Sequence, residues 1–449
     1  METALRTTKT YTYRQIGKIA FPILVSLLME QLIGMTDTIF LGRVSEVALG
    51  ASALGGIFYI TVFMIGMGFS IGAQILMGRR NGEGQYLRIG SIFYHSLTFL
   101  LLLAVVVFLL THTLAPVLLE RMVSSQHVLD ATWEYLQWRI YGFFFSFAAL
   151  MFRAFYVGTT QTKTLTLNSV VMVLSNVVFN YALIFGNFGL PAFGIAGAAM
   201  GSAMAEGVSM VFFILYTRYH IDYRKYGLDR LPRFRFSVLK RILSLSVWTM
   251  IQNFVSLSTW FLFFLAVEHL GERQLAVTNI IRNVSAFGFM TISALASTAS
   301  TLVSNLMGQR ETEAIPPLVT KIVRLAFMLM AVFVAVVALL PDAVLHIFTD
   351  EDVLVDAGRA SLYVLLSSYV LSVPAHIFFQ SISGTGNART AFTIEMTALA
   401  IYTLYIIGVV VVARADVAIG WFSEHVYGGI MLLLAWLYFR SGRWKSKRL

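Results

Sequence analysis

The sequence predicts an all-α integral membrane protein whose twelve transmembrane helices form two pseudo-symmetric six-helix lobes. Of its 449 residues, 58% are hydrophobic and 12% are charged, whereas a soluble protein has roughly 45–50% and about 25%. A membrane-spanning helix needs about 20 mostly apolar residues. Hydropathy gives twelve such segments, over residues 16–40, 48–77, 90–112, 132–157, 165–186, 194–217, 241–267, 274–306, 319–341, 357–383, 391–413 and 416–439.

The charges between these segments predict the orientation of the chain. Lys and Arg gather at both ends of the chain and in the even-numbered connections, whereas Asp and Glu gather in the odd-numbered ones. Because cytoplasmic loops carry the excess of Lys and Arg, we expect both termini in the cytoplasm. The net charge of +10 then reflects contact with anionic lipid headgroups, and nucleic acid is not expected as a partner.

A basic cytoplasmic linker, 218–240, separates an N-lobe, 1–217, from a C-lobe, 241–449. The two lobes share short sequences at equivalent places. "MGRRNGEG" follows the second apolar segment and "MGQRETEA" follows the eighth, 230 residues later; "GTTQTKT" follows the fourth and "GTGNART" the tenth, 226 residues later. Internal repeats with a site between them near the midplane are typical of secondary transporters.

Motifs of ATP-driven pumps and zinc hydrolases do not occur in this sequence. It contains neither a G-x-x-x-x-G-K-[ST] run nor H-E-x-x-H, and it has no cysteine. We therefore expect no enzymatic activity and no cofactor, and an ion gradient is the energy source that remains.

Two carboxylates interrupt the first apolar segment in "SLLMEQLIGMTDTIFLG". Glu30 and Asp37 are seven residues apart, so they share one helix face about 10 Å apart along the axis. A charge at the bilayer centre costs about 2.5–3.5 kcal/mol on insertion scales, which makes both residues functional candidates. Each can take up a proton, or bind Na⁺ with nearby amide and hydroxyl oxygens. The alternative for each is a place near the interface or in a salt bridge.

Polar residues of segments 165–186 and 194–217 can face the same site. Asn176 and Asn180 are one turn apart, so both amides can point inward. They can instead hydrogen-bond neighbouring helices without any ligand. Ser202 and Glu206 lie in a stretch rich in Gly and Ala that allows close helix approach, and Glu206 can act directly or pair with a buried basic residue.

Further polar residues inside apolar segments are candidates for the lining of a substrate cavity. Arg282 is the only strong candidate for a cation there, although it can also pair with an acid or extend to the interface. His376 can titrate near neutral pH or serve as a hydrogen-bonded packing residue. The full set is Gln31, Glu206, Gln252, Asn253, Ser256, Asn279, Arg282, His376 and Gln380.

Three stretches resemble the multidrug and toxic compound extrusion (MATE) transporters. They are "LLMEQLIGMTDTIFLGRVSEVALGA" (27–51), "FRAFYVGTTQTKTLTLNSVVMVLSNVVFNYALIFG" (152–186) and "GIAGAAMGSAMAE" (194–206). The resemblance implies a V-shaped pair of six-helix lobes around a central cavity. It also implies export of drug-like, often cationic compounds by antiport with H⁺ or Na⁺, across the plasma membrane of a bacterium (its inner membrane).

The resemblance also implies roles for individual residues. Asp37 corresponds to the family's ion-coupling acid in the N-lobe, and Asn176, Asn180 and Ser202 correspond to its partners, so Na⁺ at Asp37, Asn176 and Asn180 is one possible form of the site. Glu30 is an unusual second acid. Some relatives carry an acid where Asn180 stands, which weakens a proton relay. The branch with acids in the C-lobe is not matched, because Ser256 and Gln380 are the nearest polar residues there.

Two other function classes remain at this point. One is a flippase for lipid-linked oligosaccharides or polysaccharides, whose cavities tend to be more cationic. The other is a channel-like or receptor-like membrane protein, which would not move a substrate in response to a gradient. The expected partners are small organic molecules and membrane lipid, and the protein is expected to be a monomer.

Overall fold

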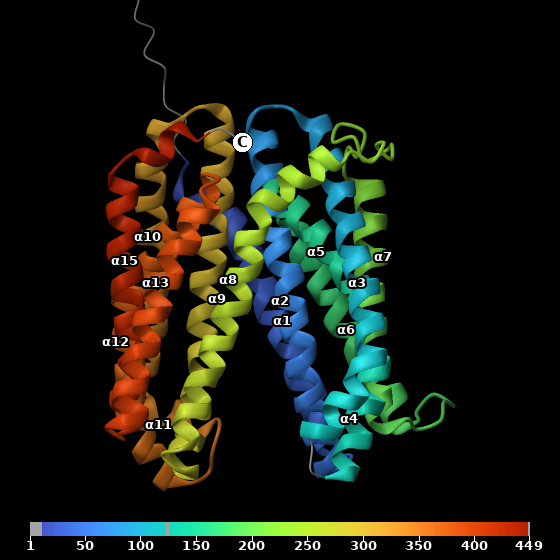
Figure 1. Cartoon of the computed structure of the whole chain (residues 1–449), viewed down its shortest axis with the longest axis vertical. Helices are drawn as coiled ribbons and strands as arrows, with labels where there is room; N and C mark the ends of the chain where they lie inside the picture. Colours follow the sequence, from blue (N-terminus) through green and yellow to red (C-terminus); the bar gives the residue numbers. More distant parts are fainter. Residues whose placement is uncertain (1–10, 123–124, 448–449) are drawn as a thin grey trace, which may run out of the picture. The chain divides into compact units, whose positions relative to one another are not determined.

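The computed structural model describes residues 11–122 and 125–447, and this part of the chain is helical and contains no strand (Figure 1). The predicted all-α membrane fold is confirmed. The helices are α1 (Tyr13–Gly42), α2 (Glu46–Gly82), α3 (Tyr86–Met122), α4 (Gln126–Arg139), α5 (Gly142–Gly158), α6 (Lys163–Phe185), α7 (Gly194–His220), α8 (Phe236–Glu268), α9 (Glu272–Gln309), α10 (Ile315–Leu339), α11 (Pro341–His346), α12 (Asp352–Gly384), α13 (Ala388–Ile406), α14 (Val417–Trp421) and α15 (Ser423–Arg440). Short 3₁₀ turns lie at Thr312–Ala314 and Arg443–Ser446, and a π-helical turn over Ile407–Val412 extends α13.

Twelve membrane spans were predicted, and the part of the chain that the structure describes contains twelve if the bent pair α4 and α5 is counted as one span. Eleven helices of the described chain are long and apolar enough to cross a membrane. The pair α4 and α5 passes the same test only together, with a bend of 47° at the break between them. The predicted span 132–157 is thus bent rather than straight, and the break falls at Ile140 and Tyr141.

Local chemistry explains several helix ends. The Ser45 hydroxyl caps α2 by accepting a hydrogen bond from the backbone N–H of Ala48, at 3.0 Å, because the first N–H groups of a helix have no partner within it. After α6 the chain turns at Gly186, where φ is +74°; glycine adopts this left-handed conformation without the cost of a Cβ. Pro341 stands at the start of α11, where its missing N–H would have no helical partner.

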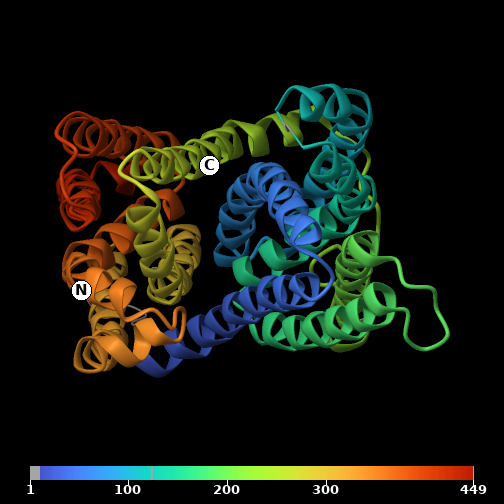
Figure 2. The same cartoon turned by 90° about the horizontal axis from the view of Figure 1, so that it is seen from below.

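The chain forms two compact units, which Figure 2 shows from the end. One comprises residues 25–250, and in it α6 packs along α7 while α2 and α5 pack against each other. The other comprises residues 251–449 together with the chain up to Leu24; there α12 packs between α9 and α15, and α13 against α15. The division falls inside α1 and inside α8. The lobes 1–217 and 241–449 with their linker stay a prediction.

The basic segment between α7 and α8 is fixed to α3. The N–H of Gly90 on α3 donates to the carbonyl of Tyr226 at 2.8 Å. Farther along the segment, the N–H of Arg235 donates to Nε2 of His95 at 2.8 Å. Both bonds join the segment between α7 and α8 to α3. This segment therefore lies along the surface of the unit formed by residues 25–250.

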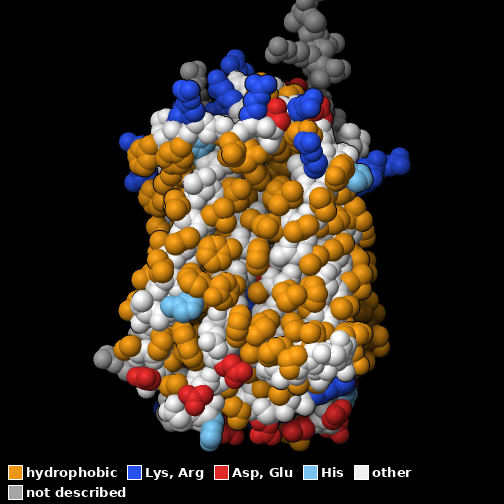
Figure 3. Space-filling model, turned by 90° about the vertical axis from the view of Figure 1, so that its right-hand side faces the viewer, with side chains coloured by type: hydrophobic (Ala, Val, Ile, Leu, Met, Phe, Trp, Pro, Cys, Tyr) orange, Lys and Arg blue, Asp and Glu red, His pale blue; other side chains and the backbone are white. Residues whose placement is uncertain are grey.

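The surface has the pattern of a membrane protein. On the face in Figure 3, hydrophobic side chains form a broad band, with Lys and Arg gathered at one end and Asp and Glu at the other. Large apolar side chains are exposed on several helices, among them Leu102 on α3, Leu174 on α6 and Leu215 on α7. A band of apolar side chains between two polar ends is what a bilayer requires.

Candidate functional site

Asp37, near the end of α1, is held by two polar residues from distant helices. Nδ2 of Asn180 on α6 donates to Oδ1 of Asp37 at 2.5 Å. The hydroxyl of Ser202 on α7 donates to Oδ2 at 2.9 Å. Both carboxylate oxygens are therefore hydrogen-bonded, one to each of two helices that also pack against each other.

Asn176 completes this group. Its Nδ2 donates to Oγ of Ser202 at 3.1 Å, and its Oδ1 accepts from Nδ2 of Asn180 at 3.2 Å. Asn176 and Asn180 are fully buried, and Ser202 is 4% exposed. The structure thus brings together four of the five predicted ion-coupling residues. We call Asp37, Asn176, Asn180 and Ser202 the Asp37 cluster.

The close approach of α6 and α7 behind the cluster depends on Gly201. A Cβ at this position would overlap Oδ1 of Asn180 and lie 3.2 Å from the backbone nitrogen of the same residue. Oδ1 of Asn180 is buried and has no hydrogen-bond partner within the described chain. A half-turn of the amide would present this oxygen toward Asp37, so the cluster can offer carboxylate, amide and hydroxyl oxygens to Na⁺, which prefers such ligands.

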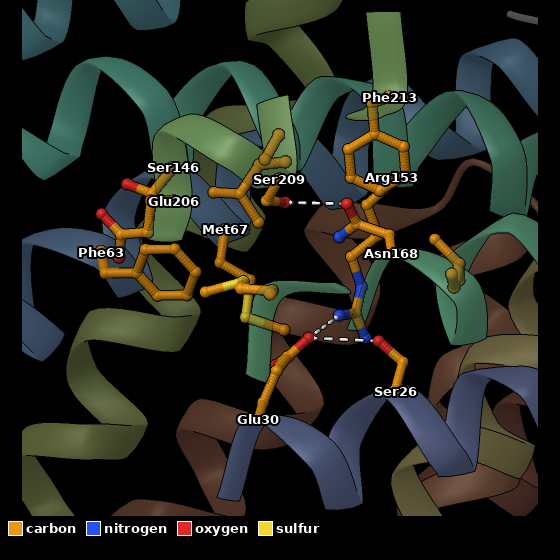
Figure 4. A pocket seen from close by; sticks show the side chains of 14 residues that line it. Ser26, Glu30, Phe63, Met67, Ser146, Arg153, Asn168, Glu206, Ser209 and Phe213 are labelled. Carbon is orange, nitrogen blue, oxygen red and sulfur yellow. Dashed lines mark hydrogen bonds and ion pairs between the residues drawn. The ribbon is translucent and has the colours of Figure 1, made fainter. Parts of the chain in front are cut away.

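A separate cavity of about 140 Å³ lies in the same unit (Figure 4). Its walls come from α1, α2, α5, α6 and α7. It is lined by Ser26, Glu30, Phe63, Met67, Ser146, Ala149, Leu150, Arg153, Leu165, Asn168, Met172, Glu206, Ser209 and Phe213. Half of these side chains are apolar or aromatic and half are polar or charged, so the cavity can combine apolar contact with polar groups that orient a small molecule.

Glu30 forms one wall of this cavity and is paired with Arg153. Nη1 of Arg153 on α5 lies 2.6 Å from Oε1 of Glu30, and the Ser26 hydroxyl donates to the same oxygen at 3.3 Å (Figure 4). The Glu30 side chain stays 44% exposed. The fifth predicted ion-coupling residue therefore belongs to the cavity and not to the Asp37 cluster.

Glu206 lines the cavity and belongs to a buried ion pair. Both guanidinium nitrogens of Arg139 bond its carboxylate, Nη1 to Oε2 at 3.0 Å and Nη2 to Oε1 at 2.7 Å. The Tyr59 hydroxyl adds a bond to Oε1 at 2.8 Å, and the Arg139 guanidinium lies 3.6 Å from the centre of the Tyr59 ring. Gly142 leaves room for the pair, because a Cβ there would overlap both partners. Of the two readings of Glu206, pairing with a buried base is the one that the geometry supports.

None of the remaining candidates lines this cavity, and all of them except Gln31, which is on α1, belong to the second unit. Arg282 on α9 lies over the rings of Trp260 and Phe264, 5.8 and 5.3 Å from their centres. Nδ1 of His376 lies 2.8 Å from the Ser372 carbonyl, which accepts a hydrogen bond from it. Gln252 is buried, and Gln31, Asn253, Ser256, Asn279 and Gln380 are half-buried. Their part in a substrate cavity stays a prediction.

The sequence reasoning overlooked three charged residues inside apolar segments. Arg282 is not the only strong candidate for a cavity cation, because Arg153 lines the cavity found here. Arg139 is the buried partner of Glu206. Glu395 on α13 is a buried acid that accepts a hydrogen bond from Ser256. The signal was present, since all three lie within predicted spans.

The stretch "GFSIG" (68–72) fits the G-x-S-x-G pattern of hydrolases but not its structural context. That pattern works at a sharp turn between a strand and a helix, which exposes the serine hydroxyl. Here it lies in the middle of α2, where the Ser70 hydroxyl is 2.8 Å from the Met67 carbonyl. The local structure therefore gives no support to a serine nucleophile.

A family model described as MatE matches the chain twice, over residues 22–182 and 249–409. The two matches begin 227 residues apart, close to the spacing of the short repeated sequences. Together they cover most of both halves of the chain. The internal repeat inferred from short sequences therefore extends over residues 22–182 and 249–409.

Named relatives and solved structures agree with this match. The "Probable multidrug resistance protein NorM" of Thermotoga maritima is 24% identical over 443 residues, covering 97% of this chain and 93% of the relative. A transporter of the MOP superfamily from Pyrococcus furiosus superposes with a TM-score of 0.85 at 18% identity over 97% of both chains. An outward-facing "multidrug resistance MATE family transporter" gives 0.85 at 18% over 95% of both. At these identities the structural likeness supports the two-lobe fold.

Proposed function

Because the chain belongs to the MatE family, we propose that it is a secondary active efflux transporter that exports drug-like, cationic organic compounds in exchange for H⁺ or Na⁺. Its relatives include proteins named for multidrug resistance. The proposed activity is movement of a solute against its own concentration gradient, which needs a site for the coupling ion and a site for the solute. No cofactor takes part.

The observation that carries the proposal is that Asp37 is hydrogen-bonded by neutral groups and, among the described residues, has no positively charged side chain beside it. Neutral donors from α6 and α7 bond its carboxylate, and within the described chain no Lys or Arg nitrogen lies within 4 Å of it. An ionised carboxylate in an apolar medium is costly without a counter-charge. A proton or Na⁺ can supply that charge, and it can leave again because no fixed cation takes its place.

The hydrogen bonds of the cluster connect ion binding to helix packing. When Asp37 is ionised, the amide of Asn180 and the hydroxyl of Ser202 are drawn to it and join α1 to α6 and α7. Bonds to a charged acceptor are about twice as strong as neutral ones. A proton or Na⁺ on Asp37 weakens these bonds, so ion uptake changes the balance between two arrangements of the lobe.

The cavity supports an organic cation as the solute. Phe63, Met67 and Met172 give it an apolar wall that can adapt to varied shapes, and an aromatic ring such as that of Phe63 attracts an organic cation. Arg153 is also present, yet its charge is balanced by Glu30. A flippase for lipid-linked oligosaccharides would need a net positive cavity, so this balance favours drug efflux.

Placement in a bacterial plasma membrane (its inner membrane) with both termini in the cytoplasm, and action as a monomer, belong to the same proposal. The distribution of Lys and Arg supports the orientation. A single chain contains both lobes and both candidate sites, so a second copy contributes nothing that the mechanism needs.

The test is efflux of ethidium from proteoliposomes under an imposed pH gradient or an imposed Na⁺ gradient. We expect one gradient to drive uphill efflux, and Asp37→Asn to abolish it. Asp130→Asn is the matched control, because Asp130 is exposed on α4 and bonds only Gln126 in the described chain. Unchanged coupled efflux in Asp37→Asn would refute the role of Asp37. Movement that only dissipates the ethidium gradient would indicate a channel.

A further inference from the structure

The second unit contains a buried carboxylate that joins three helices. Glu395 lies on α13, is 5% exposed and falls inside the predicted span 391–413. Its Oε1 accepts a hydrogen bond from the Ser256 hydroxyl on α8 and another from the Tyr427 hydroxyl on α15, the latter at 3.2 Å. A single oxygen thus connects α13 to α8 and α15.

The other oxygen of this carboxylate has no partner. Oε2 of Glu395 is buried and makes no hydrogen bond within the described chain. In the same part of the chain, no Lys, Arg or His nitrogen lies within 4 Å of Glu395. A buried carboxylate that has one oxygen without a hydrogen-bond partner and no positive charge beside it is unusual, because buried charges are normally paired.

The titratable groups around it do not supply the missing charge. On α12, the ring of His376 lies 6.1 Å from the ring of Tyr427, and its Nδ1 bonds the helix backbone. On α13 itself, the Tyr402 ring is 6.0 Å from the Tyr427 ring. On α15, Glu424 stands three residues before Tyr427 and is negative when ionised. On α9, Arg282 lies over the rings of α8 instead.

We propose that Glu395 is a second proton-binding site, in a different lobe from Asp37. The proton adds to Oε2 of the carboxylate and forms a neutral carboxylic acid, whose carbonyl oxygen Oε1 keeps its two hydroxyl donors. No other bond forms or breaks. Neutralisation removes the cost of an unpaired charge in an apolar medium, which is the reason this site takes a proton.

Proton binding at Glu395 acts on the packing of the second unit. Hydrogen bonds to an ionised acceptor are shorter and stronger than those to a neutral one. The deprotonated state therefore holds α8 and α15 firmly to α13, and the protonated state holds them less firmly. This extends the proposed antiport, but proton binding itself does not require transport and can be measured without it.

The test is infrared difference spectroscopy of the full-length protein in nanodiscs as the pH is stepped. We expect the intensity of a carboxylic acid C=O stretching band to rise as the pH is lowered. Glu395→Gln should reduce this intensity by the amount that a single carboxyl group contributes. A band that persists unchanged in Glu395→Gln overturns the proposal. Loss of the Glu395 band on adding Na⁺ at constant pH would still support proton binding, because Na⁺ would then be displacing a proton from the same carboxyl group.

A second pair of variants keeps the test valid if Glu395→Gln does not fold. Ser256→Ala retains the carboxyl and removes a donor to its carbonyl, so the Glu395 band should move to higher frequency. Ser258→Ala is the matched control on the same helix, because its hydroxyl bonds the Phe254 carbonyl and the residue is exposed. Equal spectra for the two serine variants would contradict the assignment. The infrared spectra test proton binding at Glu395 independently of whether ethidium efflux is observed.

Discussion

Nδ2 of Asn180 lies 2.5 Å from Oδ1 of Asp37, although the two residues are 143 positions apart in the chain. The bond exists because α6 is pressed against α7 at Gly201, which leaves no space for the amide to move away from α1. The hydrogen bond between Asp37 and α6 thus depends on a glycine that does not touch Asp37.

This relationship predicts that Gly201→Ala impairs ion coupling. The new Cβ would overlap Oδ1 of Asn180, so the amide must shift and its bond to Asp37 weakens. Loss of a hydrogen bond to a charged group costs about 1.5–3 kcal/mol. We expect ethidium efflux driven by the coupling gradient to fall at least about tenfold, measured in proteoliposomes.

Gly207→Ala is the control for this variant. It adds the same methyl group to the same helix, and the new Cβ meets only the Phe145 ring at an ordinary 3.7 Å. Its efflux should stay near that of the parent protein. Equal losses in the two alanine variants would show that any added volume on α7 is harmful, and would remove the specific role of Asn180.

The ion pair between Arg139 and Glu206 predicts a large stability effect. Both side chains are at most 10% exposed, and breaking a buried pair by removing one charge costs about 3–5 kcal/mol. Glu206→Gln should lower the free energy of unfolding by that amount in an SDS titration. Glu30→Gln serves as the comparison, because its pair with Arg153 is partly exposed and should contribute about 1 kcal/mol or less. Similar losses would contradict this ranking of the two pairs.

Glu30 should affect substrate binding and leave coupling intact. It lines the cavity and lies outside the Asp37 cluster. In Glu30→Gln, the apparent KM for ethidium should rise about tenfold, equivalent to about 1.4 kcal/mol, with kcat and the preferred gradient unchanged. Glu46→Gln, at the exposed start of α2, should alter neither. A fall in kcat without a change in KM would place Glu30 in the coupling step.

The segment between α7 and α8 should become easier to cut when its hold on α3 is lost. His95→Ala removes the acceptor of the Arg235 N–H and the ring that stacks on Phe234, 5.2 Å away. A hydrogen bond contributes about 1 kcal/mol net, so trypsin should cleave the variant about fivefold faster after Arg233 or Arg235. His112→Ala, an exposed residue on the same helix, should not change the rate. If trypsin cleaves both variants as slowly as the parent protein, other contacts hold the segment on α3.

The sequence predicted the Asp37 cluster well, and for an understandable reason. Asn176 and Asn180 lie one turn apart on one helix, so their shared direction follows from helical geometry alone. The family resemblance added Ser202. Their hydrogen bonds to Asp37 and to one another agree with that grouping, and their role in ion coupling stays a prediction.

The same reasoning failed for pairs that join distant segments. Glu30 was expected either with Asp37, because they share a helix face, or in a salt bridge with a partner that could not be named; it bonds Arg153, 123 residues away. Arg139 and Glu395 were visible as charges inside apolar segments, but periodicity within one helix contains no information about a partner on another. Their chemistry becomes clear only when Glu206 and Ser256 are found beside them.

The sequence by itself determined that the chain is a multi-helix membrane protein, that it is an internal repeat and which charges lie within apolar segments. These properties depend on local hydrophobicity and on short motifs, which a bilayer reads one segment at a time. Only the tertiary structure decided which buried acids are neutralised by a base, as Glu206 is by Arg139, and which are left to neutral donors, as Asp37 and Glu395 are. That difference is the basis of our proposal that Asp37 and Glu395 exchange a cation whereas Glu206 does not, because a charge in an apolar medium must be compensated by the groups that neighbouring helices bring within reach.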